Sequence, residues 1–177
     1  PSLFVHREDG DTAGIREKAW GFPDIDPRDE NIEWMGHYII DPTGKVGQEY
    51  LKRVLAMLCD EWGYDYVKID AQGEMTRVYA AHRTRMCDPS LSADRAYRYG
   101  LEAIRSAMGP SRFLLNCGHG YESSGLCDGI RIGGDVELNW PGIQRAARAT
   151  MDWLFVNSTM FYTDPDVVCV REPLPLD

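Results

Sequence analysis

The chain has 177 residues, of which 44% are hydrophobic and 27% charged, and this composition is typical of one soluble globular domain. Its formal net charge is −9, so there is no basic excess to displace counterions from nucleic acid, and we expect no nucleic-acid partner. No run of about 18 apolar residues occurs, so we expect no membrane partner either.

The cysteines and histidines give no sign of a metal or cofactor site. The five cysteines are odd in number and show no C-x-x-C spacing, and the four histidines form no H-E-x-x-H pattern. We therefore expect neither a disulfide framework nor a zinc site, and no cofactor. The chain begins at Pro1 and shows no signal peptide, so it is expected to be a piece of a longer protein whose localisation stays unknown.

The first part of the chain, residues 1–43, is rich in Gly, Pro and Asp and predicts mostly loop, with one strand at "WMGHYII" (34–40). The next segment predicts a helix that ends at Gly63, with Asp41 or Thr43 as its N-cap. Apolar residues at helical spacing are expected on its inward side: Leu51, Val54, Leu55, Leu58 and Trp62.

The segment "YDYVKID" (64–70) predicts a strand in which apolar residues surround a single lysine, Lys68. A long polar loop is expected over residues 71–88. A second helix is predicted over about 92–108, because Ser92 is a good N-cap and a Gly-Pro pair follows the helix. Its inward side is expected to carry Tyr97, Leu101, Ile104 and Met108.

Two further strands are predicted at "RFLLNCG" (112–118), an apolar run typical of a strand covered on both faces, and at "DGIRIGGDV" (128–136). Only a turn or a brief helix fits between them. A third helix is expected over 141–155, before "TMFYTD" and "VVCV", which flank "DPD" (164–166). Its inward residues are expected to be Ile143, Ala147, Met151 and Leu154. The alternation of helices and strands predicts an α/β fold with parallel strands.

Polar residues lie where the predicted strands end: Asp70, Cys117, Asp135, Asp164 and Asp166. In parallel α/β folds these ends converge on the active site. Two facing carboxylates there suit glycoside hydrolysis, one as nucleophile and one as proton donor to the leaving oxygen. Lys68 shares a strand face with Asp70 and would pair with it or bind sugar hydroxyls. The residues alone leave a second interpretation open, because an aspartate that ends a strand is also a common turn residue or helix cap.

Four segments occur in the order found in melibiase-type α-galactosidases: "DPTGKVGQEYLKRVLAMLCDEWGYDYVKIDAQG", "GLEAIRSAMGPSRFLLNCGHG", "GLCDGIRIGGDV" and "YTDPDVVCVR". Over residues 38–171 the chain resembles this family. The spacing of "YVKID", "LLNCG" and "RIGGDV" is more specific than "KID" alone. The clan to which the family belongs also holds α-N-acetylgalactosaminidases and raffinose-synthase-like enzymes.

The resemblance implies a role for each matching residue. Asp70 would be the nucleophile, and Asp135 the general acid/base. Lys68 would bind sugar hydroxyls, Arg131 would contact the sugar and the carboxylates, and Cys117 would line the pocket. The implied reaction retains configuration through a glycosyl-aspartate, needs no metal, and requires carboxyl groups about 5–5.5 Å apart.

The resemblance also implies a fold: residues 1–177 would be part of a (β/α)8 TIM barrel, roughly its fourth to seventh strands, with 1–43 mostly a loop leading into it. The first two strands and the eighth have no match here. The expected partners are an α-galactoside and the remainder of the barrel, from further chain or from other copies in a homo-oligomer. The loop "GHGYESSG" (118–125) departs from the family pattern, and His119 or Tyr121 is a candidate substrate contact there.

Three other functions stay open beside an α-galactosidase. The same residues would serve galactosyl transfer or an α-N-acetylgalactosaminidase of the same clan. A barrel fragment that binds carbohydrate without catalysis is the third, although a binding module needs no pair of carboxylates.

Overall fold

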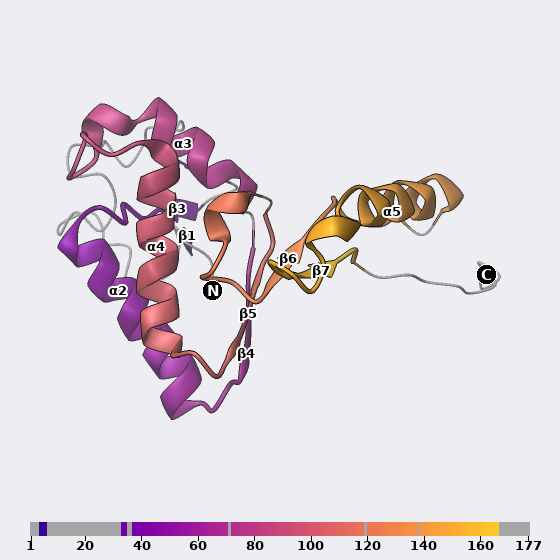
Figure 1. Cartoon of the computed structure of the whole chain (residues 1–177). Helices are drawn as coiled ribbons and strands as arrows, with labels where there is room; N and C mark the ends of the chain where they lie inside the picture. Colours follow the sequence, from indigo (N-terminus) through magenta and orange to yellow (C-terminus); the bar gives the residue numbers. More distant parts are fainter. Residues whose placement is uncertain are drawn as a thin grey trace, which may run out of the picture.

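The structure is a computed structural model that describes residues 4–6, 33–34, 37–70, 72–118, 120–137 and 139–166, with side chains from Ile40 onward except that of Glu74. Its main feature is a four-stranded parallel sheet whose strands lie in chain order, β4-β5-β6-β7 (Figure 1). The strands are β4 (Tyr66–Ile69), β5 (Phe113–Asn116), β6 (Gly129–Arg131) and β7 (Tyr162–Asp164). This arrangement confirms the predicted α/β class with parallel strands.

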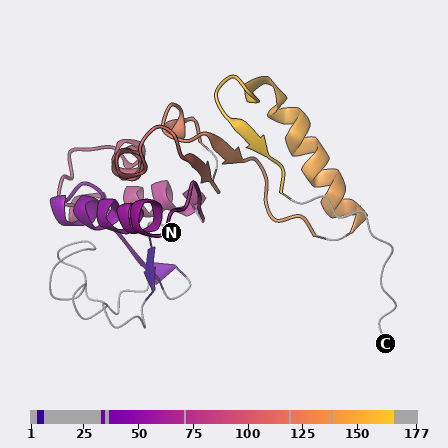
Figure 2. The same cartoon turned by 90° about the horizontal axis from the view of Figure 1, so that it is seen from below.

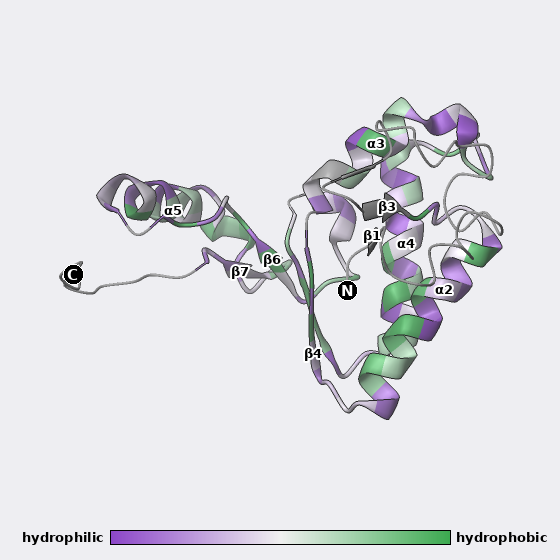
Figure 3. Cartoon of the chain, turned by 180° about the vertical axis from the view of Figure 1, so that it is seen from behind, coloured by the Kyte–Doolittle hydropathy of each residue, from purple (hydrophilic) through white to green (hydrophobic). Residues whose placement is uncertain are grey.

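Three helices cover one face of β4 and β5, whereas a fourth accompanies β6 and β7 and extends away from them (Figures 1 and 2). The covering helices are α2 (Lys45–Ala56), α3 (Met75–Ala81) and α4 (Ala93–Met108), and the fourth is α5 (Trp140–Asp152). Hydrophobic and hydrophilic bands alternate along α2 and α4 (Figure 3), as expected of helices with one buried side. Among the described residues, no helix is long and apolar enough to cross a membrane.

The two faces of the sheet differ in burial. On β4, Val67 and Ile69 are buried in the core with the three covering helices, while the alternate residues Tyr66 and Lys68 are exposed. This alternation follows from the period of two along a strand. Lys68 therefore needs no buried partner, because the face that carries it is open in this chain.

Aromatic rings line the open face at the N-terminal ends of the strands. The ring of Phe113 stacks on that of Tyr66 at 5.4 Å between centroids and lies 6.2 Å from that of Tyr162. Gly129 of the intervening strand leaves room for this, since a Cβ there would lie 3.0 Å from the Phe113 ring. The open face thus carries a row of large rings, of which Tyr66 and Tyr162 are more than half exposed.

The N-terminal prediction of one strand over 34–40 was wrong. Two short strands, β2 (Glu33–Trp34) and β3 (His37–Ile39), pair antiparallel, so the chain reverses within that segment. A further strand, β1 (Phe4–His6), pairs antiparallel with β3 and gives a small second sheet of order β1-β3-β2.

The helix that begins at Lys45 differs from its prediction in its N-cap and its inward side, whereas the helical segment ends just before Gly63, whose φ is 74°, as predicted. Gly44, not Asp41 or Thr43, is its N-cap, because the Asp41 carboxylate instead accepts hydrogen bonds from the Thr43 backbone at 2.9 Å and the Cys87 backbone at 2.7 Å. At the other end α2 continues into a π-helical turn over Met57–Glu61. That turn shifts the inward face by one residue, so the buried series runs through Leu51, Leu55 and Cys59, whereas Leu58 is only half-buried and Trp62 is 60% exposed.

The predicted loop over 71–88 was also wrong, because most of it is helical. A 3-10 turn (Gln72–Glu74) leads into α3, and a second 3-10 turn covers Arg83–Arg85. Met75, Val78 and Tyr79 are buried at helical spacing, and the Tyr79 hydroxyl donates a hydrogen bond to the carbonyl of Ile40 at 2.9 Å. The apolar pattern of α3 is only two turns long and lies among polar residues, so the sequence does not distinguish this helix from a loop.

The helix α4 matches its prediction closely. Ser92 caps it by accepting a hydrogen bond from the Arg95 backbone at 3.2 Å, and Gly109 ends it with φ at 75°. All four predicted inward residues are buried: Tyr97, Leu101, Ile104 and Met108.

The C-terminal half was predicted less well. The strand predicted over 128–136 is regular only over Gly129–Arg131, although the expected brief helix before it is present as a 3-10 turn (Tyr121–Ser123). The third helix ends at Asp152, before a 3-10 turn over Leu154–Val156.

Three of the four residues predicted to face inward on this third helix are exposed, namely Ala147, Met151 and Leu154, and Ile143 is half-buried. Gly142 and Ala146 are buried instead, and Ala149 faces Gly133. The "VVCV" segment lies outside the described residues.

Substituting one apolar residue on each of α4 and α5 tests this difference in packing. We expect Leu101→Ala, at a fully buried position, to lower the free energy of unfolding by about 2–5 kcal/mol through lost burial and a cavity. We expect Met151→Ala, at a position 69% exposed, to change it by less than about 0.5 kcal/mol. Urea denaturation of both variants measures the two values. Equal losses would contradict the described packing of α5.

Candidate active site

The C-terminal ends of the four parallel strands meet at one edge of the sheet, and the predicted site residues gather there. The register sets Lys68 beside Leu115 and Ile69 beside Asn116, so Asp70 and Cys117 follow at the same level. The Cys117 backbone donates a hydrogen bond to the carbonyl of Ile69 at 2.7 Å, which extends the strand pairing to this edge.

Lys68 and Asp70 point to the open face of the sheet, as the alternation along β4 requires. Both side chains are exposed, so the strand is buried on one face only, while the predicted shared direction of the two residues agrees with its alternation. Two residues after Asp70, the Gln72 N–H donates a hydrogen bond to the carbonyl of Cys117 at 3.1 Å, so the two loops stay together beyond the strands.

Cys117 connects the nucleophile candidate to the rest of the site. The pKa of its thiol is raised to about 11. Burial is the largest cause, followed by a hydrogen bond to Asp70 and the negative charge of Asp70, whereas the charges of Lys68 and Arg131 lower this pKa. Cys117 is therefore a neutral thiol at neutral pH, which makes it a hydrogen-bond donor to Asp70 and not a nucleophile.

Arg131 is a buried cation with two carboxylate partners. Its side chain is 3% exposed, and Nη2 lies 2.7 Å from Oδ2 of Asp166 and 3.1 Å from Oδ1 of Asp135. Nη1 reaches the Cys117 sulfur at 4.0 Å. The Nε atom is buried and has no hydrogen-bond partner among the residues that the structure describes. Arg131 thus joins the Asp70–Cys117 side of the site to Asp135, whose side chain is fully exposed.

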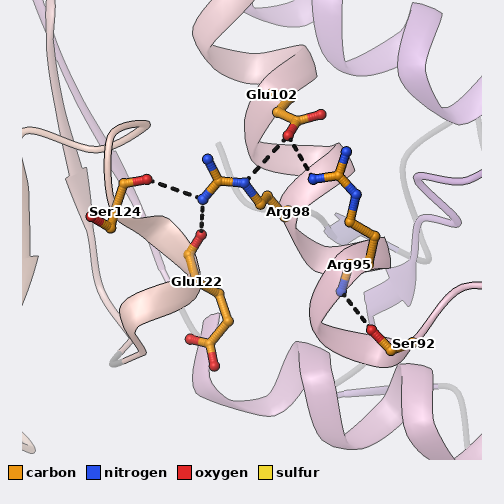
Figure 4. A network of polar contacts seen from close by, with 6 residues as sticks. All are labelled: Ser92, Arg95, Arg98, Glu102, Glu122 and Ser124. Carbon is orange, nitrogen blue, oxygen red and sulfur yellow. Dashed lines mark hydrogen bonds and ion pairs between the residues drawn. The ribbon is translucent and has the colours of Figure 1, made fainter.

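The loop after β5 borders this edge, and side chains of α4 hold it in place. Arg98 donates to the carbonyls of Glu122 at 2.8 Å and Ser124 at 3.0 Å, and Glu102 pairs with Arg98 at 3.4 Å (Figure 4). Arg95 binds the same Glu102 from the adjacent turn (Figure 4). A guanidinium that binds two carbonyls fixes the path of the loop more firmly than an exposed ion pair would.

Gly118 brings two site loops into contact. A Cβ at this position would lie 2.6 Å from both Cβ of Gln72 and the backbone nitrogen of Gly73, so only glycine fits. Tyr121 and His119 were the candidate substrate contacts of this loop. The Tyr121 ring packs near that of Trp153, at 5.6 Å between centroids, and His119 lies outside the described residues.

The structure therefore brings Lys68, Asp70, Cys117, Arg131 and Asp135 to one edge of the sheet. Within the described part of the chain, no group of three or more His, Cys, Asp or Glu side chains could hold a metal ion. The sequence predicts Asp166 only as a strand-end carboxylate and does not indicate its pairing with Arg131. The "DPD" turn was the available signal, but a contact across 35 positions of the sequence leaves no local pattern.

No model of a known protein family matches the chain. Two solved structures of an α-galactosidase from Thermus thermophilus are similar to it. The structure in complex with stachyose has a TM-score of 0.58 at 27% identity, over 75% of this chain and 30% of that chain. The structure in complex with p-nitrophenyl α-D-galactopyranoside has a TM-score of 0.66 at 22% identity, over 94% of this chain and 35% of that chain.

The chain thus spans about a third of the length of the enzyme it resembles. The comparison and the sheet agree on an α/β fold of the α-galactosidase kind, in which four parallel strands are consistent with part of a TIM barrel.

The contact between Cys117 and Asp70 can be tested by thiol alkylation. A pKa of about 11 against the ordinary 9.0 leaves roughly 100-fold less thiolate at neutral pH, so iodoacetamide should modify Cys117 slowly. Asp70→Asn removes a charge that raises this pKa and should speed the reaction several-fold. Lys68→Met removes a charge that lowers it and should slow the reaction.

Mass spectrometry of cysteine-containing peptides gives the rate at each thiol. The internal control is Cys127, which is buried in the core away from these charges and should keep its rate in both variants. The same rate at Cys117 in wild type and in both variants would show that neither charge reaches the thiol.

Proposed function

We propose that this chain is part of the catalytic barrel of a retaining glycoside hydrolase that acts on terminal α-galactosides. The observation that carries the proposal is the convergence of two aspartates, a buried arginine and a lysine at the C-terminal edge of four parallel strands. The similar enzyme from Thermus thermophilus was solved with α-galactosides bound, which supports the same class of substrate here.

In the proposed reaction Asp70 attacks the anomeric carbon and forms a glycosyl-aspartate while Asp135 protonates the departing oxygen. Asp135 then takes a proton from water, which attacks the same carbon and releases the sugar with its original configuration. The thiol of Cys117 donates a hydrogen bond to the carboxylate of Asp70, which lies on the open face.

The remaining residues would bind and orient the sugar. Lys68 lies on the same face as Asp70 and carries three donors that suit sugar hydroxyls. Arg131 has one buried Nε–H unpaired among the described residues, and a hydroxyl oxygen of the substrate would satisfy it.

The open face of the sheet indicates what else the site requires. Asp70, Lys68 and Asp135 are exposed, and so are the rings of Tyr66 and Tyr162 lower on the same face. In a closed barrel this face is the interior, which side chains fill and which excludes water from the site. We therefore include in the proposal the remaining barrel strands, supplied by further chain or by another copy.

Asp70→Asn should abolish hydrolysis of an aryl α-galactoside, because a covalent nucleophile contributes many powers of ten in rate. The assay measures aryl release by this chain and by a longer form that contains the remaining strands. Asp65→Asn is the matched control, since Asp65 precedes the same strand at its other end and is 93% exposed. Unchanged turnover in Asp70→Asn would refute the nucleophile, and binding of galactose without any turnover by wild type would favour a carbohydrate-binding fragment.

Asp135→Ala should behave differently from Asp70→Asn. A substrate with a very good leaving group needs little proton donation, so its first step should remain fast and the glycosyl-enzyme should accumulate. Azide should then restore part of the turnover and yield a galactosyl azide of retained configuration, which NMR of the product identifies. An azide product of inverted configuration would assign a different mechanism.

A further inference from the structure

We infer that Asp166 is a positioning residue that holds both Arg131 and the loop carrying Asp135 in place, a role that rests on the proposed function. The two carboxylates of the reaction come from the ends of β4 and β6, whereas Asp166 follows β7. Asp166, which follows a third strand, would thereby determine the position of the proton donor Asp135.

Asp166 is the firmer of the two partners of Arg131. The Nη2–Oδ2 distance to Asp166 is 2.7 Å and the Asp166 side chain is 22% exposed, whereas Asp135 lies at 3.1 Å with its side chain fully exposed. A buried guanidinium requires a carboxylate to offset the loss of hydration. Because Asp166 provides it, Asp135 remains free to change its protonation state without leaving Arg131 unpaired.

The same oxygen of Asp166 also fixes the backbone next to Asp135. The Val136 N–H donates a hydrogen bond to Oδ2 of Asp166 at 3.0 Å. The loop before it contains Gly133 and Gly134, and a Cβ on Gly134 would meet nothing within 4 Å. Two adjacent glycines, one of them unconfined, give this loop little stiffness of its own. The contact at Val136 therefore sets the position of the Asp135 backbone.

The conformation of Asp166 is adapted to this role. Its φ is 75°, in the left-handed region that Asp tolerates better than most residues, and its N–H donates to Oδ1 of Asp164 at 2.9 Å. The turn directs the carboxylate back toward β6. A turn without that function would accept glycine at this position at lower conformational cost.

A purely structural ion pair is the alternative, and the chain contains a matched example. Oδ2 of Asp128 pairs with Nη2 of Arg105 and accepts a hydrogen bond from the Leu114 N–H at 2.8 Å. One oxygen again binds one guanidinium and one backbone N–H. Asp128, however, precedes β6 and lies at the opposite edge of the sheet from Asp135.

Backbone amide exchange in the 177-residue chain tests the contact without requiring activity. Asp166→Ala should speed exchange at Val136 about tenfold or more and leave Leu114 unchanged, and Asp128→Ala should do the reverse. Asp166→Asn keeps an acceptor and should restore much of the protection at Val136. Unchanged exchange at Val136 in Asp166→Ala would overturn the inference, and faster exchange throughout the chain in Asp166→Ala but not in Asp128→Ala would assign Asp166 a general structural role.

The dependence on leaving group separates positioning from stability in the active form of the protein. A misplaced proton donor slows only substrates that need it, so Asp166→Ala should lower kcat/KM about 10- to 100-fold on an alkyl α-galactoside and less than about threefold on a dinitrophenyl α-galactoside. Asp128→Ala should affect both substrates equally. Equal losses on both substrates in Asp166→Ala would overturn the positioning role, whereas a wild type inactive on every galactoside would refute the proposed function and leave the exchange result to decide the contact.

Discussion

Burial of one face of β4 and β5 against α2, α3 and α4 determines the direction of every side chain on those strands. Val67, Ile69 and Leu114 lie in the core, so the residues between and after them must point the other way. The alternation along β4 alone therefore places Lys68 and Asp70 on the open face. The hydrophobic effect thus sets the geometry of the candidate site before electrostatic pairing refines it.

Arg131 provides the second constraint, since it is a charge that the fold has removed from water. Its Nη2 binds carboxylates that follow two different strands, and its Nη1 reaches the Cys117 sulfur at the end of a third. The buried cation therefore ties the ends of β5, β6 and β7 together electrostatically. The same charge lowers the pKa of Cys117, against the larger effect of burial, so the thiol reports on the charges around it.

Local signals allowed prediction of some elements and not of others. The helix α4 was predictable because a capping serine, a long apolar series and a terminal glycine all agree. The π-turn after α2 displaced the inward face by one residue, and no propensity marks such a turn in advance. The third predicted helix has an apolar side that predicts burial, yet Met151 on α5 and Leu154 just after it are exposed, and no described element covers them. The candidate site was predictable where alternation along a strand sufficed, and Asp166 was missed because its partner lies on another strand.

The strands of the main sheet lie side by side in the same order as they occur in the chain. Each strand therefore meets, as its neighbour, the strand synthesised just before it, and the contacts that form the sheet span short stretches of sequence compared with a shuffled order. Such a sheet can grow from its N-terminal side as the chain emerges from the ribosome. During that growth the newest strand always forms one exposed edge of the sheet while β4 remains the other, so the site of mispairing at the growing edge moves from β5 to β7 as synthesis proceeds.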